Sequence, residues 1–168
     1  MKLRNLKDIP FQLAAELVKN KNIVNLIYDD KSSALNNEEA LISDINQLIA
    51  ENYIGFYPAT ETGIKDVDKN TFIIINLEDF NLQGVDYNTT TTGAIYITTD
   101  KSHCLLDNGK LRLLELIDEI ETTLEGNKLA SAGKVSLTSA NYVVFSDFRC
   151  CYRINFRISD QTARKAEL

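Results

Sequence analysis

The sequence predicts a single α+β domain in which a mostly antiparallel sheet of about four or five strands packs against two or three helices. Apolar residues recur at helical spacing in the first third of the chain and again over residues 108–125. β-Branched runs and strict alternation dominate residues 71–99 and 134–158. There is no linker and no internal repeat. We therefore expect residues 1–158 to form one domain and residues 159–168 to form a flexible C-terminal tail.

The N-terminal segment predicts a helix. Asp8 is a candidate cap, and Pro10 fits the first turn, where its missing N–H costs nothing. Phe11 and Ala14 belong to the apolar positions that follow at helical spacing. The next stretch, residues 21–28, fits either a short helix or a short strand, and we favour the helix.

A further helix is expected over residues 36–51. Asn36 followed by Glu39 has the spacing of a capping box, in which the side chains satisfy free N–H groups at a helix start. Apolar residues from Leu41 to Ile49 then fall on one face.

The middle of the chain predicts strands. Residues 54–58 look like a short strand that ends at a proline. Residues 71–77 are apolar on both faces, which is typical of a central strand covered on both sides. Residues 93–99 form the returning strand, so residues 81–92, which are rich in threonine, are expected to be a hairpin tip or flexible loop.

The last third predicts a long helix followed by strands. The amphipathic helix spans residues 108–125 and stops at Gly126. Strands are expected over residues 134–138 and 141–158. In the final strand, apolar residues alternate with arginines at a period of two, so one face packs on a core and the other carries positive charge.

Composition excludes several classes of protein. The chain of 168 residues has 18 basic and 24 acidic side chains, which argues against a dedicated nucleic-acid binder. No apolar run approaches the ~18 residues of a membrane span, and we expect no secretory signal because no apolar stretch follows the basic start. Three cysteines without a C-x-x-C motif are typical of reduced thiols in the cytosol. Cys150 and Cys151 should point to opposite faces of a strand and so should not pair.

Residues suited to catalysis are few. His103 and Cys104 are adjacent, but neighbouring side chains in an extended segment diverge, so we expect no nucleophile and base there. A metal-dependent nuclease would need carboxylates aimed from a central strand, whereas here they flank the strand of residues 71–77. These carboxylates are Glu61, Asp66, Asp68, Glu78 and Asp79. The sequence predicts no catalytic residue, no cofactor and no metal site.

Opposite charges on the last strand and on the helix of residues 108–125 suggest contacts between copies. Charge complementarity predicts that the arginine face of one copy docks on the acidic helix of a neighbour. We expect the loop of residues 81–92 and the tail of residues 159–168 to make further contacts. The predicted interface residues are Arg149, Arg153, Arg157, Glu115, Glu119, Asp86, Tyr87 and Asn88.

The order of elements resembles that of the tail-terminator and tail-completion (head-tail joining, neck) proteins of long-tailed bacteriophages. The matching stretches are residues 23–27 after the first helix, the leucine-rich residues 111–120, and residues 145–160 at the end. The helix expected over residues 36–51 is additional to the shortest members of that group.

The resemblance implies a non-enzymatic virion protein of the tail or neck that is assembled in the host cytoplasm. It implies a ring of identical copies, usually a hexamer, which caps the tail tube and joins tail to head. The partners implied are the tail tube protein and a head-completion or connector protein, with DNA passing through the channel without specific binding and no contact with a membrane. Two alternatives stay open: an interaction subunit of another phage or secretion-type assembly, such as a baseplate, and, less favoured, a metal-dependent nuclease.

Overall fold

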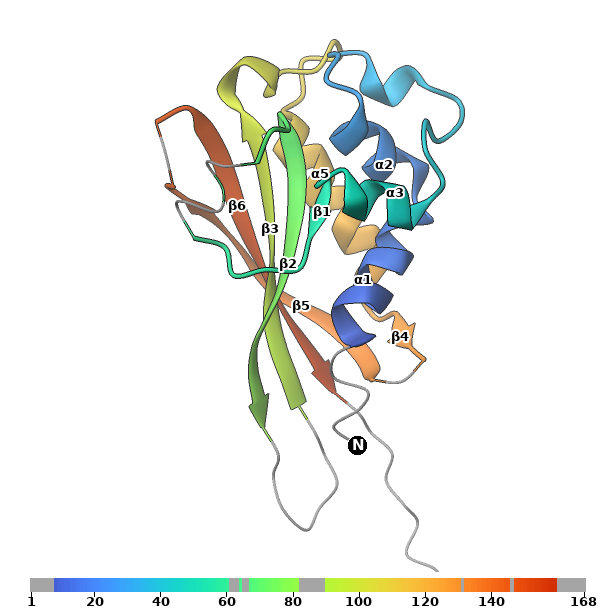
Figure 1. Cartoon of the computed structure of the whole chain (residues 1–168), viewed down its shortest axis with the longest axis vertical. Coiled ribbons are helices and arrows are strands. Elements are labelled where there is room, and N and C mark those ends of the chain that lie inside the picture. Colours follow the sequence, from blue (N-terminus) through green and yellow to red (C-terminus); the bar gives the residue numbers. More distant parts are fainter. Residues whose placement is uncertain are drawn as a thin grey trace, which may run out of the picture.

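The computed structural model describes residues 8–60, 64, 67–81, 90–130, 132–145 and 147–159, with the backbone alone at residues 80 and 81. In these residues a curled, mixed sheet of six strands carries helices on one face (Figure 1). The predicted α+β class is confirmed. The strand number is higher than expected because two of the six strands are only two residues long.

The sheet has the order β1-β2-β3-β6-β5-β4. Each pair of neighbours is antiparallel except β1 and β2, which are parallel. The hairpin of β2 and β3 extends past the helices (Figure 1). The strands are β1 (Ile54–Gly55), β2 (Thr71–Asn81), β3 (Thr90–Asp100), β4 (Lys128–Leu129), β5 (Gly133–Val143) and β6 (Arg149–Ser159).

The helical layer consists, in the described residues, of α1 (Ile9–Val18), α2 (Lys21–Tyr28), α3 (Ile45–Ala50) and α5 (Arg112–Leu124), with 3-10 turns at Ala34–Asn36 and Lys101–His103. Residues 21–28 are helical, which confirms the prediction of a short helix over a short strand. Asn20 begins α2, and its side chain accepts a hydrogen bond from the Asn22 N–H over 2.9 Å.

Helix α1 forms as expected, although two details differ. Asp8 precedes the helix without a side-chain capping bond. The buried face is set by Leu13, Ala14 and Leu17, so Phe11 is 44% exposed. The apolar spacing predicted the helix correctly but placed its buried face about one position away.

The helix predicted over residues 36–51 is wrong in its first half, because α3 begins only at Ile45. The buried side chain of Asn25 explains the difference: it donates to the carbonyl oxygen of Glu39 over 3.0 Å and accepts from the Leu41 N–H over 2.9 Å. These bonds hold the chain outside a helix. Asp44 is the actual cap, and it accepts from the Asn46 N–H over 2.9 Å.

Helix α5 is also shorter than predicted at its start. Gly109 has a φ of +78°, which an α-helix does not allow, and the Lys110 N–H bonds to the Asn108 side chain. A turn therefore occupies residues 108–110. The predicted stop is confirmed, because Gly126 has a φ of +76° just past the helix.

The break predicted between two C-terminal strands at residues 139–140 is wrong. β5 continues through this point to Val143 and pairs with β6, with a shift of register between Leu137 and Ser139. A bulge of this kind disturbs the alternation of side chains without ending the strand.

The sheet is covered on both faces. Ile73 and Ile75 of β2 belong to the main core beneath the helices. Phe72 and Ile74 face the other way into a smaller cluster with Tyr96 and Cys151. The prediction of a central strand that is apolar on both faces is therefore confirmed for β2.

Candidate interaction surfaces

The arginines of β6 lie on the sheet face opposite the helices. Ile154 and Phe156 face the main core, whereas Cys151 is buried in the smaller cluster on the opposite face. The alternation predicted from the sequence is confirmed, including the separation of Cys150 from Cys151, because Cys150 packs against the main core.

Arg149 has partners within its own chain. Its Nε lies 3.0 Å from Oδ1 of Asp100, its Nη2 donates to the Val67 carbonyl oxygen over 2.9 Å, and its guanidinium lies over the ring of Phe72. Its side chain is only 13% exposed. Arg149 is therefore held by contacts within its own chain and forms part of this sheet face.

Arg153 is partly paired in the same way. Its Nη2 lies 2.5 Å from Oε2 of Glu78 on β2, and its guanidinium lies 5.8 Å from the centre of the Tyr96 ring. About a third of each charged side chain stays exposed. The positive charge of Arg153 is therefore reduced at the surface by a neighbouring carboxylate.

Arg157 is the exposed member of the three arginines. Its Nη2 donates to the hydroxyl of Thr90 over 3.3 Å, and no carboxylate among the described residues forms an ion pair with it. Arg157 is therefore the arginine of this face best placed to meet a carboxylate of another molecule.

On helix α5, the two acidic residues predicted at the interface are engaged within the chain. Glu115 lies 2.9 Å from the Lys110 ammonium. Glu119 accepts hydrogen bonds from the side-chain amides of Asn20 and Asn22, both over 2.8 Å, and thereby joins α5 to the start of α2.

The exposed acidic residues of α5 are Asp118 and Glu121. They lie on the solvent side of the helical layer, whereas Arg157 lies on the far face of the sheet. Arg157 and the two exposed carboxylates of α5 therefore lie on opposite faces of the domain. Asp86, Tyr87, Asn88 and residues 160–168 lie outside the described residues, so their predicted contacts stay predictions.

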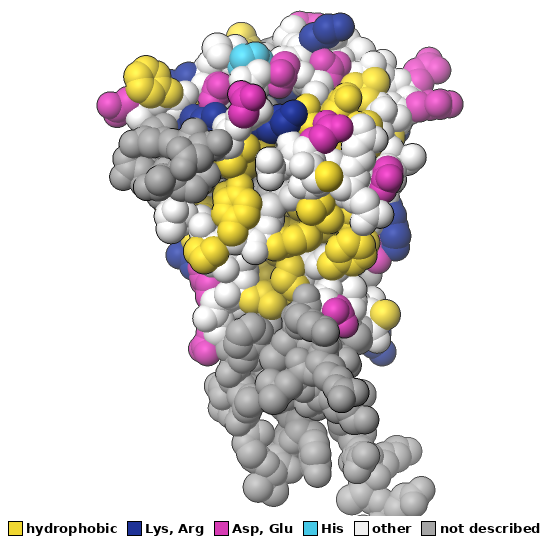
Figure 2. All heavy atoms as spheres, viewed as in Figure 1, with side chains coloured by type: hydrophobic (Ala, Val, Ile, Leu, Met, Phe, Trp, Pro, Cys, Tyr) yellow, Lys and Arg dark blue, Asp and Glu magenta, His cyan; other side chains and the backbone are white. Residues whose placement is uncertain are grey.

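Apolar side chains are exposed at the end of the β5–β6 hairpin. Val144 is 71% exposed and Phe148 is 82% exposed, and Tyr142 beside them is 52% exposed. On the face seen in Figure 2, hydrophobic side chains also extend across the middle, and charges of both signs are mixed at the upper end. Exposed aromatic residues at a hairpin end are typical of a contact site.

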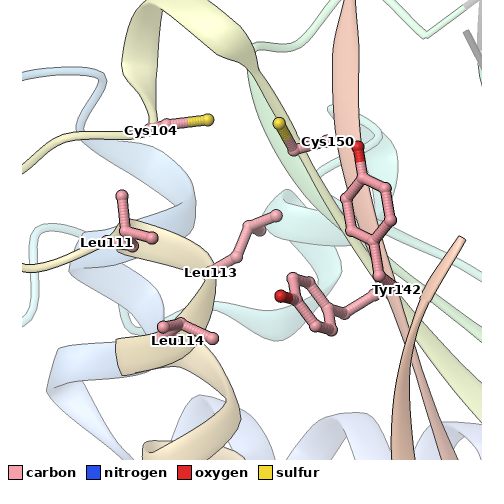
Figure 3. A pocket seen from close by; sticks show the side chains of 7 residues that line it. Cys104, Leu111, Leu113, Leu114, Tyr142 and Cys150 are labelled. Carbon is pink, nitrogen blue, oxygen red and sulfur yellow. The ribbon is translucent and has the colours of Figure 1, made fainter. Parts of the chain in front are cut away.

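A small apolar pocket of about 200 Å³ lies between the start of α5 and the β5–β6 hairpin (Figure 3). It is lined by Cys104, Leu111, Leu113, Leu114, Tyr142, Cys150 and Tyr152. Sequence reasoning missed this pocket, because its residues come from segments far apart in the chain.

The residues weighed for catalysis do not come together in the described part of the chain. His103 Nδ1 bonds to the Ser102 hydroxyl over 2.9 Å, whereas the Cys104 thiol donates to the Asp100 carbonyl oxygen over 3.5 Å. Burial raises the pKa of Cys104 to about 11. The thiol is therefore protonated at neutral pH and is a weak nucleophile.

The flanking carboxylates are likewise scattered. Glu61 and Asp66 lie outside the described residues, and Glu78 pairs with Arg153. Among the described residues, no group of three or more His, Cys, Asp or Glu side chains is placed to hold a metal ion. None of the described helices has the length and apolarity needed to cross a membrane.

Comparison with known proteins gives one finding. A family model described as YomW matches residues 20–158, which run from the start of α2 through all but the last residue of β6. A search of curated proteins gives no match.

Proposed function

The chain belongs to the YomW family, a family of phage origin, and we propose that it is a structural protein of the phage particle that closes into a ring as a tail terminator or neck component. The observation that carries this proposal is the placement of one exposed arginine and two exposed carboxylates on opposite faces of one domain. Arg157 lies on the far face of the sheet, and Asp118 and Glu121 lie on the outside of α5.

Such an arrangement favours head-to-tail contacts. When two different surfaces of the same chain are complementary, each copy binds the next through the same pair of surfaces. The copies form a ring if the rotation that relates each copy to the next brings the last copy back to the first. The charges set the orientation of neighbours and speed their encounter, while apolar side chains such as Phe148 supply area to bury.

The edge of β5 offers a second kind of contact. On its outer edge, β5 pairs with β4 at Gly133 and Lys134, and Val135 and Leu137 are hydrogen-bonded to the segment after α5. From Ser139 to Val143, no described strand bonds to this edge. An open edge accepts a strand of another protein through backbone hydrogen bonds. We assign this edge to contact with the tail tube protein or the head-completion protein.

The net charge of -6 fits a ring through which DNA passes. A channel lined by a protein with an excess of acidic residues does not bind the phosphate backbone, so DNA moves through it without specific contacts. No catalytic step, cofactor or membrane contact is part of this proposal.

Deletion of the gene from the phage tests the proposal. We expect DNA-filled heads separate from tails, with tubes of irregular length in electron micrographs, and restoration of whole particles by the wild-type chain supplied in trans. Tubes of normal length that lack their distal end would instead indicate a baseplate subunit. Cleavage of DNA by the purified protein with Mg²⁺ or Mn²⁺ would indicate the nuclease.

A further inference from the structure

Two of the three cysteines meet in the apolar pocket. Cys104 follows the 3-10 turn after β3, and Cys150 is the second residue of β6, yet both line the pocket and both are partly exposed free thiols. Figure 3 shows that their sulfur atoms point toward one another. Cys151, by contrast, is fully buried on the other face of the sheet.

The backbone holds both cysteines at the same end of the sheet. Cys150 pairs in register with Thr99 on β3. Cys104 lies a few residues further along the same chain segment, and its thiol donates to the carbonyl oxygen of Asp100. Burial in this pocket is the main cause of the raised pKa of Cys104.

We propose that Cys104 and Cys150 are an oxidisable pair of thiols, which a small-molecule disulfide such as glutathione disulfide converts into an intramolecular disulfide. This inference is independent of the ring proposed above. The bond would close a loop that includes all of α5 and tie the segment before this helix to β6.

The reaction proceeds by two exchanges. The Cys150 thiol loses its proton to solvent, and its thiolate attacks one sulfur of glutathione disulfide. This step breaks the glutathione S–S bond, forms a mixed disulfide and releases one glutathione thiolate. Cys104 then loses its proton and attacks the Cys150 sulfur, which releases the second glutathione. The pair loses two electrons and two protons, and glutathione disulfide gains both. Cys104 acts second because its thiol is held protonated by burial.

The test uses the full chain, reduced and then incubated with glutathione disulfide at mildly alkaline pH. Free thiols are counted after denaturation, and peptides are mapped by mass spectrometry without reduction. We expect the three thiols to fall to one, with a peptide that links Cys104 to Cys150, and the midpoint of thermal unfolding to rise relative to the reduced protein.

Single serine variants provide matched controls. Cys151→Ser should form the same linked peptide. Cys104→Ser should stop at a stable mixed disulfide of glutathione with Cys150, and Cys150→Ser should form no bridge. The proposal is overturned if the wild-type chain keeps three free thiols, carries only mixed disulfides, or links Cys151.

Discussion

The guanidinium of Arg112 donates a hydrogen bond from Nη1 to the carbonyl oxygen of Leu26 over 2.6 Å, and the arginine is completely buried. The same group reaches the carbonyl oxygens of Asp29, Lys31 and His103 over 2.7, 2.6 and 2.9 Å. The first residue of α5 thus satisfies backbone acceptors at the end of α2 and in the loop after it, where a cation is favoured by the helix dipole.

Replacing Arg112 with Met should therefore destabilise the fold. The change leaves several buried carbonyl groups without a donor, and we expect the free energy of unfolding in urea to fall by about 3–5 kcal/mol. Arg112→Lys keeps the charge but lacks the planar fork, so its loss should be smaller. The same change at the exposed Arg157 should alter stability by less than about 0.5 kcal/mol. Equal effects at Arg112 and Arg157 would contradict this role.

Gly93 is required by close packing between β3 and its neighbours. A Cβ at this position would collide with the carbonyl oxygen of Asn76 and come within 2.5 Å of the Phe156 ring. Because the backbone oxygen cannot rotate away, we expect Gly93→Ala to lower the free energy of unfolding by about 3 kcal/mol. Gly109→Ala meets no atom within 4 Å and should cost about 1 kcal/mol through its positive φ alone. Denaturant titration of both variants should show the larger loss in the free energy of unfolding for Gly93→Ala.

Cys151 should make stability fall at alkaline pH. Burial raises the pKa of this thiol from 9.0 to about 11. The protonated thiol contributes fully to the free energy of unfolding below pH 9. This contribution is lost as the pH rises toward 11, because the thiol of the unfolded chain loses its proton at a lower pH than the buried thiol does. The slope from this residue is at most about 1.4 kcal/mol per pH unit. Urea titrations at pH 9 and 11 should show a smaller decline for Cys151→Ala than for the wild-type chain, and an identical decline would refute the assignment.

Phe148 should matter for contacts and not for folding. Its side chain is 82% exposed, so Phe148→Ser removes little buried area and should change the free energy of unfolding by less than about 0.5 kcal/mol. In the ring proposed here, the same substitution should weaken association with neighbouring copies. Sedimentation velocity measures the association between copies, and thermal unfolding serves as the control for stability. A large loss of stability would show instead that Phe148 packs within its own chain.

Periodicity predicted the main elements because the signals were local. The alternation of β6 and the amphipathic pattern of α5 each lie within one segment, and both are confirmed. The first half of the helix expected over residues 36–51 was wrong because Asn25, which is distant in sequence, binds that segment. No local pattern contains that contact.

The surfaces were predictable only in part. The sequence placed three arginines on one face correctly, but Asp100 and Glu78, which neutralise two of them, belong to other strands. Arg112 gave no signal because its four acceptors are backbone groups. The pair of Cys104 and Cys150 likewise depends on how β3 and β6 align.

The most direct test of the head-to-tail ring uses two charge-reversed variants, Arg157→Glu and Asp118→Arg, with assembly measured by native mass spectrometry in the presence of tail tubes. Each variant alone places like charges at every contact and should not close a ring. In an equimolar mixture the copies can alternate, because Glu at position 157 meets Arg at position 118 in one contact and the native pair meets in the next. In a head-to-tail ring, only the mixture and the wild-type chain should form closed rings, with an even number of copies in the mixture. Rings formed by either variant alone, or none from the mixture while the wild-type chain assembles, would contradict it.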